Sequence, residues 1–198
     1  YTTKTYAGAL QAFGGSGSGI QAGGAGTIFQ KAASAIDGDV VIDNNGLSGA
    51  TTNQTAAATW TIPNLTIKGK AEYVIPSGAT TIVTTTLTLT DGKLTNNGTL
   101  TASAASSFGS TAAGSVLTNT STGSMSLPAT TTLTNLTFYQ NGTISNSSSV
   151  SLTLGTGAVM EVRNTDATTA LTFANLTIQS GGTLTHQANT SPKLLNLS

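Results

Sequence analysis

The 198-residue sequence contains no cysteine. A disulfide framework and a thiolate metal site are therefore both excluded, and stability has to come from packing alone. Charge is scarce as well: Asp, Glu, Lys and Arg make up 7% of the chain, with seven basic and seven acidic residues, against about a quarter in an average globular protein. The charges are scattered singly and form no basic stripe that could follow a phosphate backbone, so nucleic acid is not expected as a partner.

Long apolar runs and catalytic groups are missing too. No stretch approaches the roughly 18 apolar residues of a membrane span, so insertion into a membrane is not expected. Histidine occurs once, as His186, and no Gly-x-Ser-x-Gly elbow accompanies it, which leaves a Ser-His-Asp triad without candidates. The acids that a glycosidase would pair, such as Glu72, Glu161 and Asp166, are dispersed along the chain. We therefore expect no enzymatic activity.

Short runs that alternate apolar residues with threonine recur along the chain. This period of two is typical of strands with one buried face, and no run has the helical period. The pattern Asn-Leu-Thr-Φ, where Φ is a large apolar residue, begins at Asn64, Asn135 and Asn175, and related Leu-Thr-Leu runs begin at Leu87 and Leu152. Repetition at intervals of roughly 16 to 24 residues favours a parallel β-solenoid, or β-helix, with short strands and Gly/Asn turns. A β-sandwich is the alternative all-β fold.

We expect one continuous domain with two parts that differ in composition. Residues 1–46 form a glycine-rich first segment with the first rungs, and residues 47–198 form the solenoid repeat region. Asparagine at the corners can adopt left-handed backbone conformations or form a ladder with the asparagine of the next rung. Neither end has the polar composition of a solenoid cap, so we expect the chain to be part of a longer protein. Its partners would then be neighbouring segments or identical subunits.

The first 46 residues resemble a module found in very large bacterial surface proteins, which are repetitive, β-helical and adhesin-like. The likeness lies in the stretches from Tyr6 to Gly15, from Gln21 to Phe29 and from Val41 to Asn44. The Gly-Thr-Leu-Thr rungs that follow are similar to the generic β-helix of many secreted adhesins. The resemblance implies a structural or adhesive module of an extracellular, cell-surface protein, and it brings no catalytic residues. An alternative is a filament subunit whose residues 1–6 add a strand to a neighbour's edge.

Asp37, Asp39 and Asp43 are candidate calcium ligands, because calcium prefers hard oxygen atoms. Asp39 and Asp43 are four residues apart on one predicted strand, hence on the same face but far from each other. Solvated acids at a turn are therefore the favoured interpretation. No cofactor other than this candidate calcium ion is expected.

Trp60, Tyr73 and Tyr139 are candidate carbohydrate contacts, because aromatic faces stack on pyranose rings. A surface polysaccharide would then be the partner, and a carbohydrate-binding module is a further alternative function. Packing of these rings on or under the strands is the competing interpretation.

Asn-x-Ser/Thr sequons are numerous in a chain so rich in these residues. N-linked glycans need exported and accessible positions, so an asparagine that points inward in a ladder could not carry one. The candidate glycosylation sites are Asn53, Asn64, Asn97, Asn119, Asn135, Asn141, Asn146 and Asn175.

Overall fold

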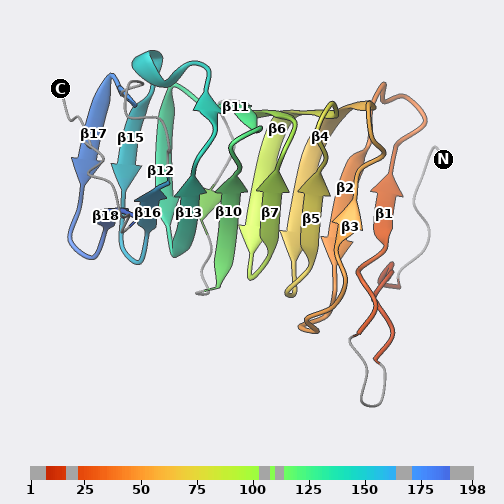
Figure 1. Cartoon of the computed structure of the whole chain (residues 1–198). Helices are drawn as coiled ribbons and strands as arrows, with labels where there is room; N and C mark the ends of the chain where they lie inside the picture. Colours follow the sequence, from red (N-terminus) through yellow and green to blue (C-terminus); the bar gives the residue numbers. More distant parts are fainter. Residues whose placement is uncertain (1–7, 17–21, 103–107, 110–113, 164–170, 188–198) are drawn as a thin grey trace.

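A computed structural model of the chain describes residues 8–16, 22–102, 108–109, 114–163 and 171–187. Strands dominate this part of the chain, and its one helical element is a single 3-10 turn, η1 (Ser147–Ser149). The strands stand side by side along one axis, from β1 at one end to β17 and β18 at the other (Figure 1). The fold is a β-solenoid of about six turns, which confirms the predicted parallel solenoid and excludes the β-sandwich.

Each coil places strands on three faces, which we name A, B and C. Face A contains residues 59–62 of β4 (Thr59–Lys68), residues 80–83 of β6 (Thr80–Thr90), β8 (Thr99–Ala102), β11 (Ser124–Ser126) and β14 (Thr143–Ile144). Face B contains β2 (Asp39–Asp43), residues 64–68 of β4, residues 86–90 of β6, β9 (Phe108–Gly109), β12 (Thr130–Thr134), β15 (Ser151–Leu154) and β17 (Asn175–Ile178). Face C contains β3 (Thr52–Asn53), β5 (Glu72–Ile75), β7 (Lys93–Asn96), β10 (Ser115–Asn119), β13 (Leu136–Gln140), β16 (Val159–Val162) and β18 (Thr183–His186).

Strands β4 and β6 each pass from face A to face B without a break. The register between them shifts after Ile62, where Pro63 of β4 lies opposite two residues of β6. Proline has no N–H to donate to a ladder, so a bulge is one of the few places where a sheet accepts it. Of the two halves of β4, only the second pairs with β2. Of the two halves of β6, only the first pairs with β8. The first and second halves of these long strands therefore belong to different faces.

The coils stack in parallel and in register, so that each inward side chain lies on its counterpart in the next coil. Side chains alternate across a strand, and the residues between the inward ones therefore point to solvent. On face C the coil repeats about every 21 to 23 residues. Five consecutive coils place large, fully buried side chains at one inward position of face C: Tyr73, Leu94, Leu117, Phe138 and Met160.

The Asn-Leu-Thr-Φ pattern proves to mark strands and not equivalent positions of the coil. Its copies at Asn64 and Asn175 lie on face B, whereas the copy at Asn135 leads into β13 on face C. Strands of all three faces alternate mostly apolar inward residues with outward residues that are often threonine or serine, so strands of different faces can have similar sequences. The predicted rungs are therefore real strands, but the alignment of Asn135 with Asn64 and Asn175 was wrong.

The N-terminal end of the solenoid is covered on faces B and C. β1 (Thr27–Gln30) pairs antiparallel with β2 and extends face B. On face C, residues 22–25 run beside residues 49–52, since Ala22 bridges Gly49 in parallel and accepts a hydrogen bond from the Ala50 N–H at 3.1 Å. No described strand takes the corresponding place on face A.

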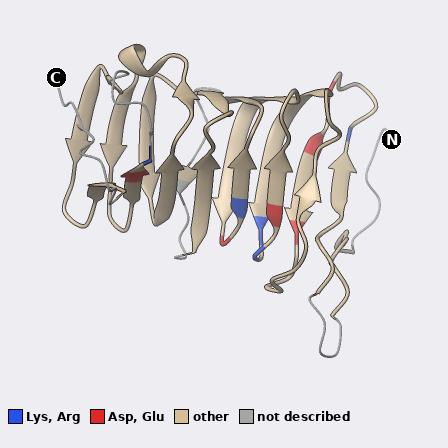
Figure 2. Ribbon diagram, viewed as in Figure 1, with Lys and Arg blue, Asp and Glu red and all other residues tan. Residues whose placement is uncertain are grey.

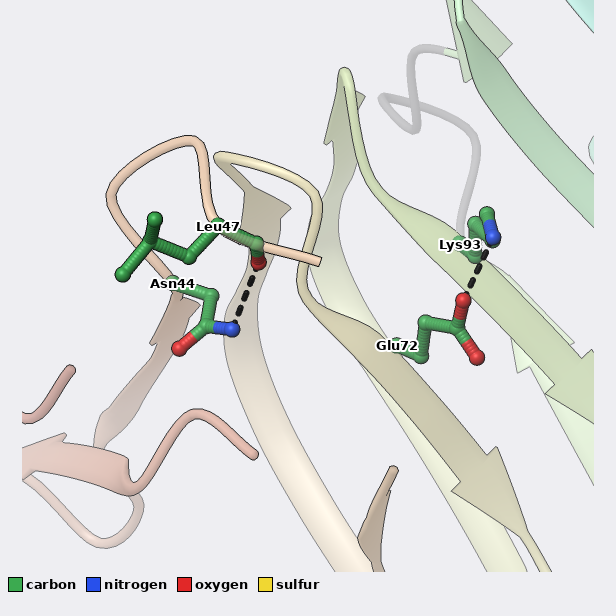
Figure 3. A network of polar contacts seen from close by, with 4 residues as sticks. All are labelled: Asn44, Leu47, Glu72 and Lys93. Carbon is green, nitrogen blue, oxygen red and sulfur yellow. Dashed lines mark hydrogen bonds and ion pairs between the residues drawn. The ribbon is translucent and has the colours of Figure 1, made fainter. Parts of the chain in front are cut away.

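Asn44 joins the glycine-rich segment to the first coil. Its buried side chain accepts a hydrogen bond from the Gly14 N–H at 2.8 Å and donates to the carbonyl of Leu47 at 2.6 Å (Figure 3). It also donates to the Gly23 carbonyl at 3.3 Å. One side chain thus satisfies backbone groups on both sides of position 46, so the described part of residues 1–46 is hydrogen-bonded to the solenoid.

A buried amide ladder interrupts the apolar core on face C. Asn96 Nδ2 donates to Asn119 Oδ1 at 2.9 Å, and Asn119 Nδ2 donates to Gln140 Oε1 at 3.2 Å. All three side chains are fully buried. Asn96 and Asn119 also donate to backbone carbonyls of the next coil, those of Ser124 and Thr143, and Gln140 donates to the carbonyl of Gly142. The asparagine ladder expected from the sequence is therefore present. It ends at Asn96 Oδ1, which has no hydrogen-bond partner among the described residues because the preceding coil presents Ile75 there.

Replacing Asn119 by leucine should lower the free energy of unfolding by about 2–4 kcal/mol. Leucine has the same number and branching of side-chain heavy atoms but no polar atom, so it leaves Gln140 Oε1 and the carbonyl of Thr143 without the donor they share. Urea denaturation followed by circular dichroism measures the change. Asn53→Leu is the control, because Asn53 is exposed on the same face. Equal effects at the two positions would contradict a structural role for the ladder.

Candidate functional site

A cavity of ≈ 420 Å³ lies at the N-terminal end of the solenoid, where face A begins. This volume is in the range of small-ligand sites, about 300–1,000 Å³. The cavity has contributions from β1, β2, the connection between them and the first half of β4. Its lining residues are Thr27, Phe29, Asp37, Val40, Thr59, Trp60, Thr61 and Ile62.

The first half of β4 forms the edge of face A beside this cavity. Its partner is β6, and the Thr80 N–H donates to the carbonyl of Ala58 at 2.9 Å. In a parallel ladder, alternate residues of a strand direct their backbone groups to opposite sides. Thr59 and Thr61 therefore turn their N–H and C=O groups away from β6, toward a side that no described strand occupies.

Two aromatic side chains form the apolar part of the cavity. Trp60 is partly exposed and stacks on the buried ring of Tyr73, with the centroids 6.4 Å apart and the planes at 24°. Phe29 is 60% exposed. Its ring lies on the backbone of Gly38, where an added Cβ would come within 2.6 Å of Phe29 Cζ. Only glycine fits at position 38 without moving this ring.

Asp37 is the one charged residue of the cavity. Its carboxylate forms no hydrogen bond or ion pair with the residues that the structure describes. The other two predicted calcium ligands are engaged elsewhere: Asp39 accepts a hydrogen bond from Asn64 at 2.8 Å, and Asp43 pairs with Lys68 at 3.3 Å.

The predicted calcium site is therefore not assembled. Asp39 and Asp43 occupy the two ends of the extended strand β2, which separates them by roughly 13 Å. Within the described residues, no group of three acidic or histidine side chains is close enough to hold a metal ion. The sequence pattern placed the carboxylates on one face, but a straight strand keeps them apart.

No protein-family model, no curated protein and no solved structure matches this chain.

Of the three predicted carbohydrate contacts, only Trp60 lines the cavity. Tyr73 is 1% exposed and supports Trp60 from below, so it cannot touch a ligand. Tyr139 lies on face C, where the guanidinium of Arg163 covers its ring at 3.6 Å from the centroid. Phe29 was missed, because the short run Thr27-Ile28-Phe29-Gln30 predicts a strand but not which of its apolar residues stays exposed.

The predicted glycosylation sites differ widely in accessibility. Asn119 is fully buried in the amide ladder, so it cannot accept a glycan in the folded chain. Asn146 binds both backbone groups of Leu127, at 3.0 and 2.6 Å, and holds a turn. Exposed positions are Asn53 and Asn175, and intermediate ones are Asn64, Asn97, Asn135, Asn141 and Asn146.

The acidic residues considered for catalysis lie far apart. Glu72 pairs with Lys93 of the next coil (Figure 3), and Glu161 pairs with Arg163 at 2.6 Å. Glu72 and Glu161 are on the same face but four coils apart, or roughly 19 Å at one strand spacing per coil. That separation exceeds the span of a glycosidase pair. Asp166 lies outside the described residues.

No helix in the described part of the chain is long and apolar enough to cross a membrane.

A buried polar cluster forms the floor beneath Trp60. Thr81 Oγ1 and the Tyr73 hydroxyl both donate to Gln54 Oε1, at 2.5 and 3.2 Å. Gln54 Nε2 donates to the carbonyls of Ala58 and Thr80, both at 2.9 Å. Burial raises the pKa of Tyr73 to about 12, against a partly opposing effect of the Thr81 hydroxyl.

This shift predicts a loss of stability at high pH. The unfolded chain releases the Tyr73 proton above its ordinary pKa of 10.0, whereas the folded chain holds it to about 12. The contribution is therefore complete below pH 10 and falls by about 2–3 kcal/mol as the pH rises to about 12. Urea titrations of the protein and of Tyr73→Phe across this range isolate the effect. Curves of equal slope for the two proteins would contradict it.

Proposed function

We propose that the chain is a non-catalytic structural and adhesive module of an extracellular, cell-surface protein. The observation that supports this role best is the continuous solenoid itself. Every coil adds about one strand spacing of length, roughly 4.8 Å, and is held to the next by parallel ladders and buried stacks. Such a body is suited to hold a binding surface at a distance from its attachment.

The outer surface supports the same role. The parts of the strands that lie on face A contain no charged residue, and Figure 2 shows how few charged residues the described part of the ribbon carries. Because the register on face A is unbroken, hydroxyls align in a column over five coils. The column consists of Thr59, Thr80, Thr99, Ser124 and Thr143. A neutral, hydroxylated surface stays hydrated without attracting counter-ions, which is favourable for a protein exposed to a changing medium.

The proposal predicts a stability that barely depends on salt. The ion pairs of the described residues, Lys68–Asp43, Lys93–Glu72 and Arg163–Glu161, are partly exposed, and such pairs contribute little. The urea midpoint should therefore change little between about 0.05 M and about 1 M sodium chloride. A steep dependence would show that electrostatic contacts, and not the stacked coils, hold the module together.

Surface exposure is the direct test of the location. Antibodies raised against the folded chain should label intact cells that produce the protein, with antibodies to a cytoplasmic protein as the control. Labelling that appears only after the cells are permeabilised would contradict the proposal.

A filament subunit is the second candidate, and the open edge of face A favours it. An added strand could pair there with Thr59 and Thr61. Residues 1–6, the segment expected to supply the strand, lie outside the described residues. Deleting them should leave a monomer in light scattering if they join subunits; polymers that persist after the deletion would rule out exchange through this segment.

A further inference from the structure

We propose that the cavity at the N-terminal edge of face A binds a hexopyranose unit of a polysaccharide. In this arrangement Trp60 and Phe29 contact the ring, and Asp37 accepts hydrogen bonds from its hydroxyl groups. The inference names the contact through which the module would hold its target, so it rests on the adhesive part of the proposed function.

Trp60 is the uncovered end of an otherwise buried stack. The inward residues that follow it on face A are Thr81, Leu100 and Met125, all 0% exposed. Trp60 occupies the same position in the first face A strand, but no described strand covers its other side. Its free surface therefore faces the cavity, and an aromatic surface of this kind suits the apolar face of a pyranose.

The aromatic surfaces are held in place before a ligand arrives. Tyr73 stacks on Trp60 and is itself fixed through Gln54, while the backbone of Gly38 supports Phe29. Trp60, which packs on the fixed ring of Tyr73, therefore has little side-chain freedom to lose on binding, which favours affinity for a small ligand.

The polar groups of the cavity include both donors and acceptors. Asp37 offers a carboxylate without a described partner, and the free edge of β4 offers the N–H and C=O groups of Thr59 and Thr61. Sugar hydroxyls donate and accept, so they can use all of these groups. An organic cation would use only the carboxylate and the rings, and an added strand would have no use for the carboxylate. The combination favours a sugar, and the volume of ≈ 420 Å³ suits about one or two rings.

The test uses the fluorescence of Trp60, which is the only tryptophan of the chain. Cellobiose, maltose, mannobiose and diacetylchitobiose are titrated separately into the full chain. We expect at least one of them to cause a saturable change in emission. Absence of a response to all four would overturn the proposal.

Two variants then test the site. Phe29→Ala and Asp37→Asn should each weaken binding of the responding disaccharide by ~10-fold, and both residues are accessible enough for the variants to fold. The matched control is Asp39→Asn, which changes a neighbouring acid outside the cavity and should leave the affinity unchanged. Circular dichroism verifies the fold of each variant. Equal affinity in all variants would overturn the assignment.

Two further titrations distinguish the rival occupants. A response to tetramethylammonium but to no sugar would assign a cation site, and a response only to a peptide of residues 1–6 would assign a strand site; either would overturn the proposal. The sugar site and the surface location can fail independently. Sugar binding by a protein that antibodies cannot reach on intact cells would contradict the location but support the site. Surface labelling without sugar binding would instead leave the location standing and overturn the site.

Discussion

Parallel stacking of each coil on the next, in register, is the constraint on which the rest of the structure depends. An inward residue is buried only if the neighbouring coil presents a matching residue at the same position, as Leu94 does for Leu117 on face C. The turns between strands are equally constrained, because they also pack on the neighbouring coil. At Gly123 an added Cβ would lie 2.3 Å from the carbonyl oxygen of Asn96, so the turn can approach the coil below only as glycine. Coil length can vary, but the positions of the strands cannot.

The same constraint explains the composition. A stack of this kind leaves little room for inward charge, because a buried charge would need a partner in the next coil. Amides can satisfy one another along the stack, as Asn96, Asn119 and Gln140 do. Outward positions need only β-branched or small polar residues, and threonine satisfies this requirement while favouring the extended backbone. The result is a neutral protein whose stability is carried by packing and hydrogen bonds.

The fold could be predicted from the sequence, but the face of each strand and the site could not. Alternation of leucine with threonine identifies strands wherever they occur, and it is the same on all three faces, so Asn64 and Asn135 looked equivalent. Buried and exposed asparagines share the sequon, and only the register separates Asn119 from Asn53. The cavity depends on β1 turning antiparallel, which brings Phe29 beside Trp60 from 31 residues away. The sequence makes Asp37 a candidate calcium ligand, whereas the structure places it in the cavity with Phe29 and Trp60.

The spacing of the coils tests the account most directly. Because the chain has no cysteine, spin labels react only with cysteines introduced at chosen positions. Val74 and Thr185 occupy one outward row of face C, five coils apart, and Thr95 lies one coil nearer to Thr185. Double electron–electron resonance should give a backbone separation of roughly 24 Å for the labelled pair at positions 74 and 185, and a separation about 5 Å shorter for the pair at positions 95 and 185. Equal distances for the two pairs, or a longer distance for the second, would contradict a stack of coils.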